Sequence, residues 1–215
     1  FLPLYLRGLG RPLANGDEAV YAELARSMAR TGDWATPRWQ GRPVFNRPPA
    51  SVWPLALAMK VAGPIPAVLH VVGAVQALGI VLLVYALGAL LWTRTTGLLA
   101  ALLTGSATLQ LLYARTVVAD NLLVLCTLGS LVAWELGRKQ RRWLLLWGLC
   151  LGLALLTKQL LGLLPLMAPV ADLLGRRRMN RRQVGLAIVL GLALAGLWLL
   201  AETLRFGPAF LREHL

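Results

Sequence analysis

The stretch PAVLHVVGAVQALGIVLLVYALGALLW, residues 66–92, decides the fold class of this chain. It contains one histidine and no aspartate, glutamate, lysine or arginine. A helix rises about 1.5 Å per residue, so a helix over this stretch can cross a hydrocarbon core of about 30 Å with some tilt. We therefore predict a transmembrane helix here.

The composition extends this prediction to the whole chain. Of the 215 residues, 58% are hydrophobic and only 14% are charged, which lies outside the usual range of soluble domains. The formal net charge of +13 would suit a nucleic-acid-binding protein. Lysine and arginine, however, are confined to short segments between apolar runs and form no basic face interleaved with aromatic residues. We predict an all-α, polytopic membrane protein with no nucleic-acid partner.

The other apolar runs define the remaining spans. They cover residues 96–113, 120–137, 143–174 and 184–204. The run at 143–174 is interrupted at Lys158 and lies between two basic clusters, at 138–142 and 176–182. Because such clusters stay on the cytoplasmic side, an even number of crossings must separate them. We expect two short spans with Lys158 recessed at their outer turn, and about six transmembrane helices in all.

The same count of crossings orients the polar segments. It places residues 7–60 and the tail outside the cytoplasm. Six polar side chains then share that side of the membrane: Asp17, Glu18, Arg47, Arg115, Asp120 and Lys158. We expect three regions: an extracytoplasmic loop with amphipathic interfacial helices over 1–63, a transmembrane bundle over 64–204, and the start of a later extracytoplasmic loop over 205–215.

The first external loop carries the densest polar sequence. A helix is predicted from Asp17 to about Arg30, with acidic residues in its positive first turn. Its apolar stripe consists of Val20, Leu24 and Met28. Such a stripe is typical of a helix lying in the membrane interface.

The start of this helix holds candidate catalytic side chains. Asp17 and Tyr21 are four residues apart and therefore share a face. The carboxylates of Asp17 and Glu18 suit acid or base chemistry. The alternative is that both are only a helix cap and a partner of the helix dipole.

Arg47 is a candidate anion-binding residue. Pro48 holds it extended, and Pro49 can occupy the first turn of a helix over 50–62. The guanidinium then emerges beside a helix N-terminus, where a phosphate is favoured. The alternative is an arginine that reaches toward lipid headgroups.

Three later residues are further candidates on the same side. Asp120 opens a helix, so it could be only a dipole partner, and Arg115 could simply pair with it. Lys158 is harder to explain without function, because an ammonium group in a recessed turn is costly unless an anion pairs with it. The pattern therefore indicates a cationic site for an anionic ligand.

Several motifs resemble those of one enzyme family. They are Asp17-Glu18-Ala19-Val20-Tyr21 with Gly32-Asp33-Trp34 and Phe45-Asn46-Arg47-Pro48-Pro49, then Ala114-Arg115 with Asp120-Asn121, then Leu156-Thr157-Lys158, and finally Phe206-Gly207-Pro208. In this order they resemble the glycosyltransferases of the GT-C class that use polyprenyl-phosphate sugars. That class includes the aminoarabinose lipid A transferases and the protein mannosyltransferases.

The resemblance implies an activity and roles. It implies transfer of a sugar from an undecaprenyl-phosphate-type donor to a lipid, glycan or protein acceptor, with inversion, on the extracytoplasmic face of a bacterial inner membrane. Asp17 would act on the acceptor, with Glu18 and Asp120 as further catalytic carboxylates. Arg47, Lys158 and Arg115 would bind the donor phosphate, and Tyr21 would line the cavity.

The chain also departs from the family pattern. Asn46 stands where the family usually has glutamate, which removes a carboxylate that could help to hold a divalent metal. Gln159 replaces the glycine that usually follows Lys158. The sequence indicates no particular cofactor, and a bound divalent metal stays an open alternative. The resemblance further implies that the family's first membrane helix precedes this segment and that more spans follow it.

Two functions without catalysis stay open at this stage. A flippase or transporter-like protein would use the same cationic site to hold a polyprenyl phosphate. A scaffold subunit of a membrane complex would need neither cation. Only the transferase requires Asp17.

Overall fold

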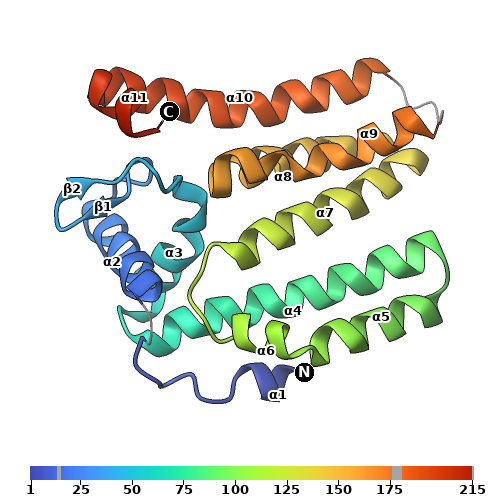
Figure 1. Ribbon diagram of the computed structural model, residues 1–215, viewed down its shortest axis with the longest axis horizontal. Helices are drawn as coiled ribbons and strands as arrows, with labels where there is room; N and C mark the ends of the chain where they lie inside the picture. Colours follow the sequence, from blue (N-terminus) through green and yellow to red (C-terminus); the bar gives the residue numbers. More distant parts are fainter. Residues whose placement is uncertain (14–15, 176–180, 215) are drawn as a thin grey trace.

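The computed structural model describes residues 1–13, 16–175 and 181–214. Arg176, Arg177 and Arg178 of the second basic cluster lie outside the described residues. The architecture is all-α apart from one short antiparallel hairpin (Figure 1). Long helices lie side by side in a bundle, and a small external region covers one end of it.

We call residues 1–62 the external region because they lie outside the bundle of long helices, which follows them along the chain. The external region contains α1 (Leu2–Tyr5), α2 (Gly16–Thr31), β1 (Arg38–Trp39), β2 (Arg42–Pro43), η1 (Pro49–Ser51) and α3 (Trp53–Ala62). The bundle contains α4 (Pro66–Leu91), α5 (Arg94–Ser106), α6 (Thr108–Tyr113), α7 (Asp120–Lys139), α8 (Trp143–Lys158), η2 (Gln159–Leu166), α9 (Met167–Leu174) and α10 (Arg181–Phe206), and α11 (Pro208–His214) follows it.

Within the described residues, four helical stretches are long and apolar enough to cross a membrane. They are Pro66–Leu91, Asp120–Lys139, Trp143–Leu174 and Arg181–Phe206. The chain is therefore a multi-pass membrane protein, but the predicted count of six spans is not confirmed. α4 and α7 begin where the sequence predicts them.

The predicted span over 96–113 is wrong as a single helix. Ala107 is extended, with φ −61° and ψ 133°, and separates α5 from α6. Ser106 weakens the helix just before this break, because its hydroxyl donates to the carbonyl of Leu102 at 2.8 Å. The Phe1 ring also lies against Gly105, where a Cβ atom would come within 2.7 Å of it.

The stretch Trp143–Leu174 reverses direction at the predicted position. The Nε1–H of Trp147 on α8 donates to the carbonyl of Pro165 on η2 at 3.3 Å. A Cβ atom at Gly162 on η2 would lie 2.4 Å from the backbone of Leu155, so η2 packs directly on α8. Lys158 lies at the end of α8, where the chain turns back (Figure 1).

Small residues allow close packing of the other helices. Gly88 on α4 meets Gly97 on α5, and Gly148 on α8 meets Ala187 on α10. A Cβ atom at Gly148 would lie 2.4 Å from the Ala187 carbonyl oxygen. Such contacts are typical of helix association in membranes.

The apolar stripe of α2 packs on protein. Leu24 and Met28 are buried in a cluster with Val52, Leu55 and Met59 from the segment that leads through α3. The stripe therefore contacts α3 and not lipid. The prediction that α2 lies in the membrane interface is not confirmed. α2 and α3 form the small core of the external region.

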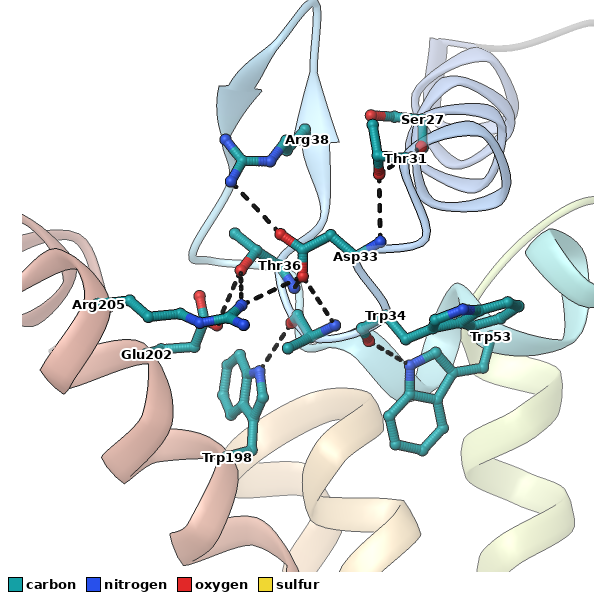
Figure 2. A network of polar contacts seen from close by, with 11 residues as sticks. Ser27, Thr31, Asp33, Trp34, Thr36, Arg38, Trp53, Trp198, Glu202 and Arg205 are labelled. Carbon is teal, nitrogen blue, oxygen red and sulfur yellow. Dashed lines mark hydrogen bonds and ion pairs between the residues drawn. The ribbon is translucent and has the colours of Figure 1, made fainter.

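A polar network joins the external region to the end of α10 (Figure 2). Asp33 accepts hydrogen bonds from the backbone N–H groups of Ala35 and Thr36, and Arg205 lies 3.2 Å from the same carboxylate. The Thr36 hydroxyl donates to the buried Glu202 at 2.8 Å, and Trp198 donates to the Ala35 carbonyl at 2.9 Å. These contacts hold the loop after α2 against α10.

We expect part of the acid sensitivity of folding to come from Asp33. Burial acts to raise its pKa, but the backbone N–H groups of Thr36 and Ala35 and the Arg205 guanidinium hold it below the ordinary value of 3.8. A carboxylate whose pKa is lower in the folded state stabilises the fold above its unfolded pKa, and that contribution is lost as the pH falls through the folded value. Asp33→Asn should therefore flatten the decline of the thermal midpoint between about pH 5 and pH 3.

Glu23→Gln is the matched control, since Glu23 is a partly exposed carboxylate on α2 that pairs only weakly with Arg26 at 3.8 Å. It should keep the wild-type acid dependence. Identical acid dependence in Asp33→Asn and in the wild type would contradict the assignment.

Candidate active site

A cavity of about 460 Å³ opens where the external region meets the bundle. Four segments form its walls: the first turns of α2, the segment before η1, the approach to α7, and the turn between α8 and η2. Its lining consists of Asp17, Tyr21, Asn46, Arg47, Pro48, Val118, Ala119, Asp120, Thr157, Lys158, Gln159, Leu160 and Leu161. Five of the seven predicted site residues therefore share one cavity.

Arg47 is held from two sides. Pro48 is extended, with φ −61° and ψ 152°, so Arg47 lies outside any helix and its side chain reaches across to α2. The guanidinium lies 2.7 Å from the Asp17 carboxylate and 4.7 Å from the centre of the Tyr21 ring. Burial acts to lower the pKa of Arg47, but the hydrogen bond to Asp17 and the neighbouring Tyr21 raise it above its ordinary value. The result is a permanent cation in a defined position.

Lys158 forms the second cation of the cavity. Its ammonium group lies 2.5 Å from the carboxylate of Asp120, the first residue of α7. The pair joins α7 to the end of α8 and meets the cost of placing an ammonium group in a turn between apolar helices. The alternative pairing of Asp120 with Arg115 is not observed.

The cavity contains two cations, each paired with a carboxylate that an anionic ligand can displace. Asp17 and Asp120 keep 63% and 42% of their side-chain surface exposed. Ion pairs that exposed are worth only about 0 to 1 kcal/mol. A phosphate group can therefore replace a carboxylate beside Arg47 or Lys158 and release that carboxylate at the same time.

Glu18 and Arg115 do not line the cavity. Glu18 is fully buried on another side of α2 and accepts a hydrogen bond from the backbone N–H of Val117 at 3.1 Å. Arg115 donates to the Leu4 carbonyl at 2.7 Å, and its own carbonyl accepts a hydrogen bond from Arg11. Their positions give no support to the predicted catalytic role of Glu18 or to the phosphate contact of Arg115.

Sequence reasoning overlooked several parts of this region. Val118, Ala119, Leu160 and Leu161 contribute apolar lining, which no local pattern distinguishes from ordinary span residues. His70 of α4 is fully buried, and its Nδ1 lies 2.7 Å from the Leu9 carbonyl oxygen.

The cavity offers a metal ion few ligands. In the part of the chain that the structure describes, no three His, Cys, Asp or Glu side chains gather closely enough to hold a metal ion. Asp17 and Asp120 are the carboxylates of the lining, each beside a cation, and Asn46 adds an amide. For the divalent metal that the sequence leaves open, the cavity therefore offers two carboxylates and one amide.

Comparison with known proteins identifies the family of the chain. The sequence profile of the family described as "Dolichyl-phosphate-mannose-protein mannosyltransferase" matches residues 46–200. The chain belongs to that family. The resemblance inferred from the motifs is confirmed by this match.

Curated relatives are similar over most of the chain. A protein of Pseudomonas aeruginosa named undecaprenyl phosphate-alpha-4-amino-4-deoxy-L-arabinose arabinosyl transferase is 34% identical over 93% of this chain and 38% of its own length. A relative from Sodalis glossinidius is named undecaprenyl phosphate-alpha-4-amino-4-deoxy-L-arabinose arabinosyl transferase 2. It is 32% identical over 80% of this chain and 32% of its own length. The chain thus spans well under half of these relatives.

Solved structures share the fold. ArnT from Cupriavidus metallidurans in the apo state superimposes with a TM-score of 0.86 at 24% identity, over 97% of this chain and 41% of that one. The form of ArnT bound to undecaprenyl phosphate gives a TM-score of 0.87 at 23% identity, over 99% of this chain and 42% of that one. At such identities the likeness shows the fold.

The turn that carries Lys158 is strained, and this strain can be measured. Gln159 has φ 35° and ψ −107°, a conformation that favours glycine. Gln159→Gly and Gln159→Ala both remove the side chain, but only alanine keeps the Cβ atom. We expect the glycine variant to unfold with a free energy about 1 kcal/mol higher than the alanine variant, measured by denaturant titration in detergent micelles. An alanine variant of equal or greater stability would contradict this geometry.

Proposed function

We propose that this chain forms the donor-binding and catalytic portion of a membrane glycosyltransferase. The donor is a sugar linked to a polyprenyl phosphate, and the acceptor is a lipid, a glycan or a protein. The arrangement of Arg47 and Lys158 in one cavity, each beside a carboxylate, carries the proposal. The names of the curated relatives and the undecaprenyl phosphate in the ArnT structure support the class of donor.

The two cations match the charge change of the reaction. A sugar joined to a lipid phosphate is a phosphodiester with one negative charge, and the departing lipid phosphate gains a second. Arg47 can hold the first charge, and Lys158 can stabilise the charge that develops as the bond to the sugar breaks. Interactions that strengthen during this bond cleavage accelerate the reaction.

The carboxylates serve the acceptor. When the donor phosphate takes the guanidinium of Arg47, Asp17 becomes free to accept the proton of the acceptor hydroxyl or amine. The acceptor atom then forms its bond to the anomeric carbon while the bond from that carbon to the phosphate oxygen breaks. The electron pair leaves with the polyprenyl phosphate, and one direct displacement inverts the anomeric carbon.

The rim of the cavity suits a lipid carrier. Leu160 and Leu161 of η2 line the cavity and expose 79% and 52% of their surface. A polyprenyl chain can run from the phosphate site over these side chains into the bilayer. We further propose that the cavity faces the extracytoplasmic side of a bacterial inner membrane, because the first basic cluster lies in the loop between α7 and α8 at the other end of the bundle (Figure 1).

Asp17→Asn tests the catalytic proposal. In the protein expressed from its complete coding sequence, we expect sugar transfer to fall by about 100-fold or more, since general-base catalysis contributes factors of that order. Binding of undecaprenyl phosphate should remain, because the amide no longer competes for Arg47. Transfer is measured with a radiolabelled lipid-linked sugar, and binding by native mass spectrometry. Glu23→Gln on the same helix is the control, and unchanged transfer in Asp17→Asn would contradict the role.

Arg47→Gln tests the phosphate site. We expect the affinity for undecaprenyl phosphate to fall by about 10-fold, the loss of one charge-assisted contact. Arg26→Gln is the matched control, because Arg26 is a half-exposed arginine of α2 outside the cavity lining. Equal losses in both variants would indicate only general attraction of anionic lipid. Lipid binding without any transfer by the wild-type protein would favour a flippase-like function.

A further inference from the structure

We propose that Glu18 is a positioning residue that sets the place of Asp120. This inference rests on the proposed function for its effect on transfer, but its structural part stands separately. Glu18 lies beside Asp17 in sequence and on another side of α2, because successive residues of a helix are rotated by about 100°. Asp17 faces the cavity, whereas Glu18 points into the protein behind it.

The Glu18 carboxylate joins segments that are distant in sequence. Its Oε1 accepts the backbone N–H of Val117 at 3.1 Å and lies 3.5 Å from the guanidinium of Arg11. The Nε2 of His70 on α4 lies 3.8 Å from the same oxygen. Glu18 and His70 are fully buried, so these contacts have little competition from water.

Val117 begins the part of the chain that forms one wall of the cavity. The next three residues, Val118, Ala119 and Asp120, all line it. This segment lies between α6 and α7 and has no regular structure until α7 begins. The bond from Val117 to Glu18 therefore anchors the approach to α7, and with it the carboxylate that holds Lys158.

Arg11 strengthens the same junction. It donates to the carbonyl of Arg115, two residues before Val117, and also lies beside Glu18. The segment is thus held through one N–H group and one carbonyl group. Asp17 lies on another side of α2. The position of this one helix therefore affects two walls of the cavity, the first turns of α2 and the approach to α7.

Two substitutions separate positioning from simple stabilisation. Glu18→Ala leaves the buried N–H of Val117 without its acceptor, whereas Glu18→Gln keeps an oxygen acceptor at the same place. We expect Glu18→Ala to lower the turnover of sugar transfer by about 10- to 100-fold, the loss caused by misplaced reacting groups. Glu18→Gln should stay within about threefold of the wild type, because a neutral acceptor retains most of the bond.

Hydrogen exchange reports the structural part directly. In the complete protein in lipid nanodiscs, exchange of the peptide over residues 114–122 should accelerate in Glu18→Ala and return toward the wild-type rate in Glu18→Gln. Leu151→Ala is the control for stability alone, because it removes a fully buried side chain of α8 that packs in a different hydrophobic cluster from Val117. It should lower the thermal midpoint without accelerating exchange selectively in residues 114–122.

The outcomes distinguish this inference from the proposed function. Unchanged exchange in Glu18→Ala would overturn the positioning role, whatever happens to transfer. Equal loss of transfer in Glu18→Gln and Glu18→Ala would also overturn it, because the charge rather than the acceptor would then matter. Selective exchange with no transfer by the wild-type protein would support the positioning of Asp120 and refute the transferase instead.

Discussion

The pairing of Arg47 with Asp17, and of Lys158 with Asp120, is the interaction on which the geometry of the candidate site depends. Ionised groups beside hydrocarbon are costly unless an opposite charge lies next to them. Each pair joins residues that are 30 or 38 positions apart in the chain. The first pair holds the segment before η1 against α2 within the external region, and the second holds the end of α8 beside the start of α7.

Much of the fold can be predicted from the sequence, because it depends on the hydropathy of single segments and on the positions of the basic clusters between them. Hydropathy alone predicts residues 66–92 as a helix, and α4 is observed over Pro66–Leu91. The reversal at Lys158 follows from the basic clusters on either side of its apolar run. The break at Ala107 could not be predicted this way, since hydropathy does not register the packing of Phe1 on Gly105.

The candidate site shows the same division. Asp17, Arg47, Asp120 and Lys158 attract notice in the sequence because each charge needs a partner, and the cavity contains all four. Glu18 and Arg115 carry the same signal but serve other contacts. Glu18 meets a backbone group 99 residues away, and Arg115 meets one 111 residues away. No spacing rule predicts contacts of that range, so sequence alone could not separate cavity residues from their supports.

The paired charges also explain how donor binding and acceptor activation can be one event. The Asp17 carboxylate accepts a hydrogen bond from the Arg47 guanidinium at 2.7 Å, so this carboxylate oxygen is occupied by Arg47. In the proposed reaction, the donor phosphate replaces Asp17 at Arg47, so Asp17 becomes available as a base only when a donor is bound. In the same proposal, Lys158 stabilises the second negative charge that the lipid phosphate gains when the sugar leaves. The ion pairs that balance the charges of the cavity beside the bilayer would thus, in the proposed reaction, favour the state in which the bond to the sugar breaks.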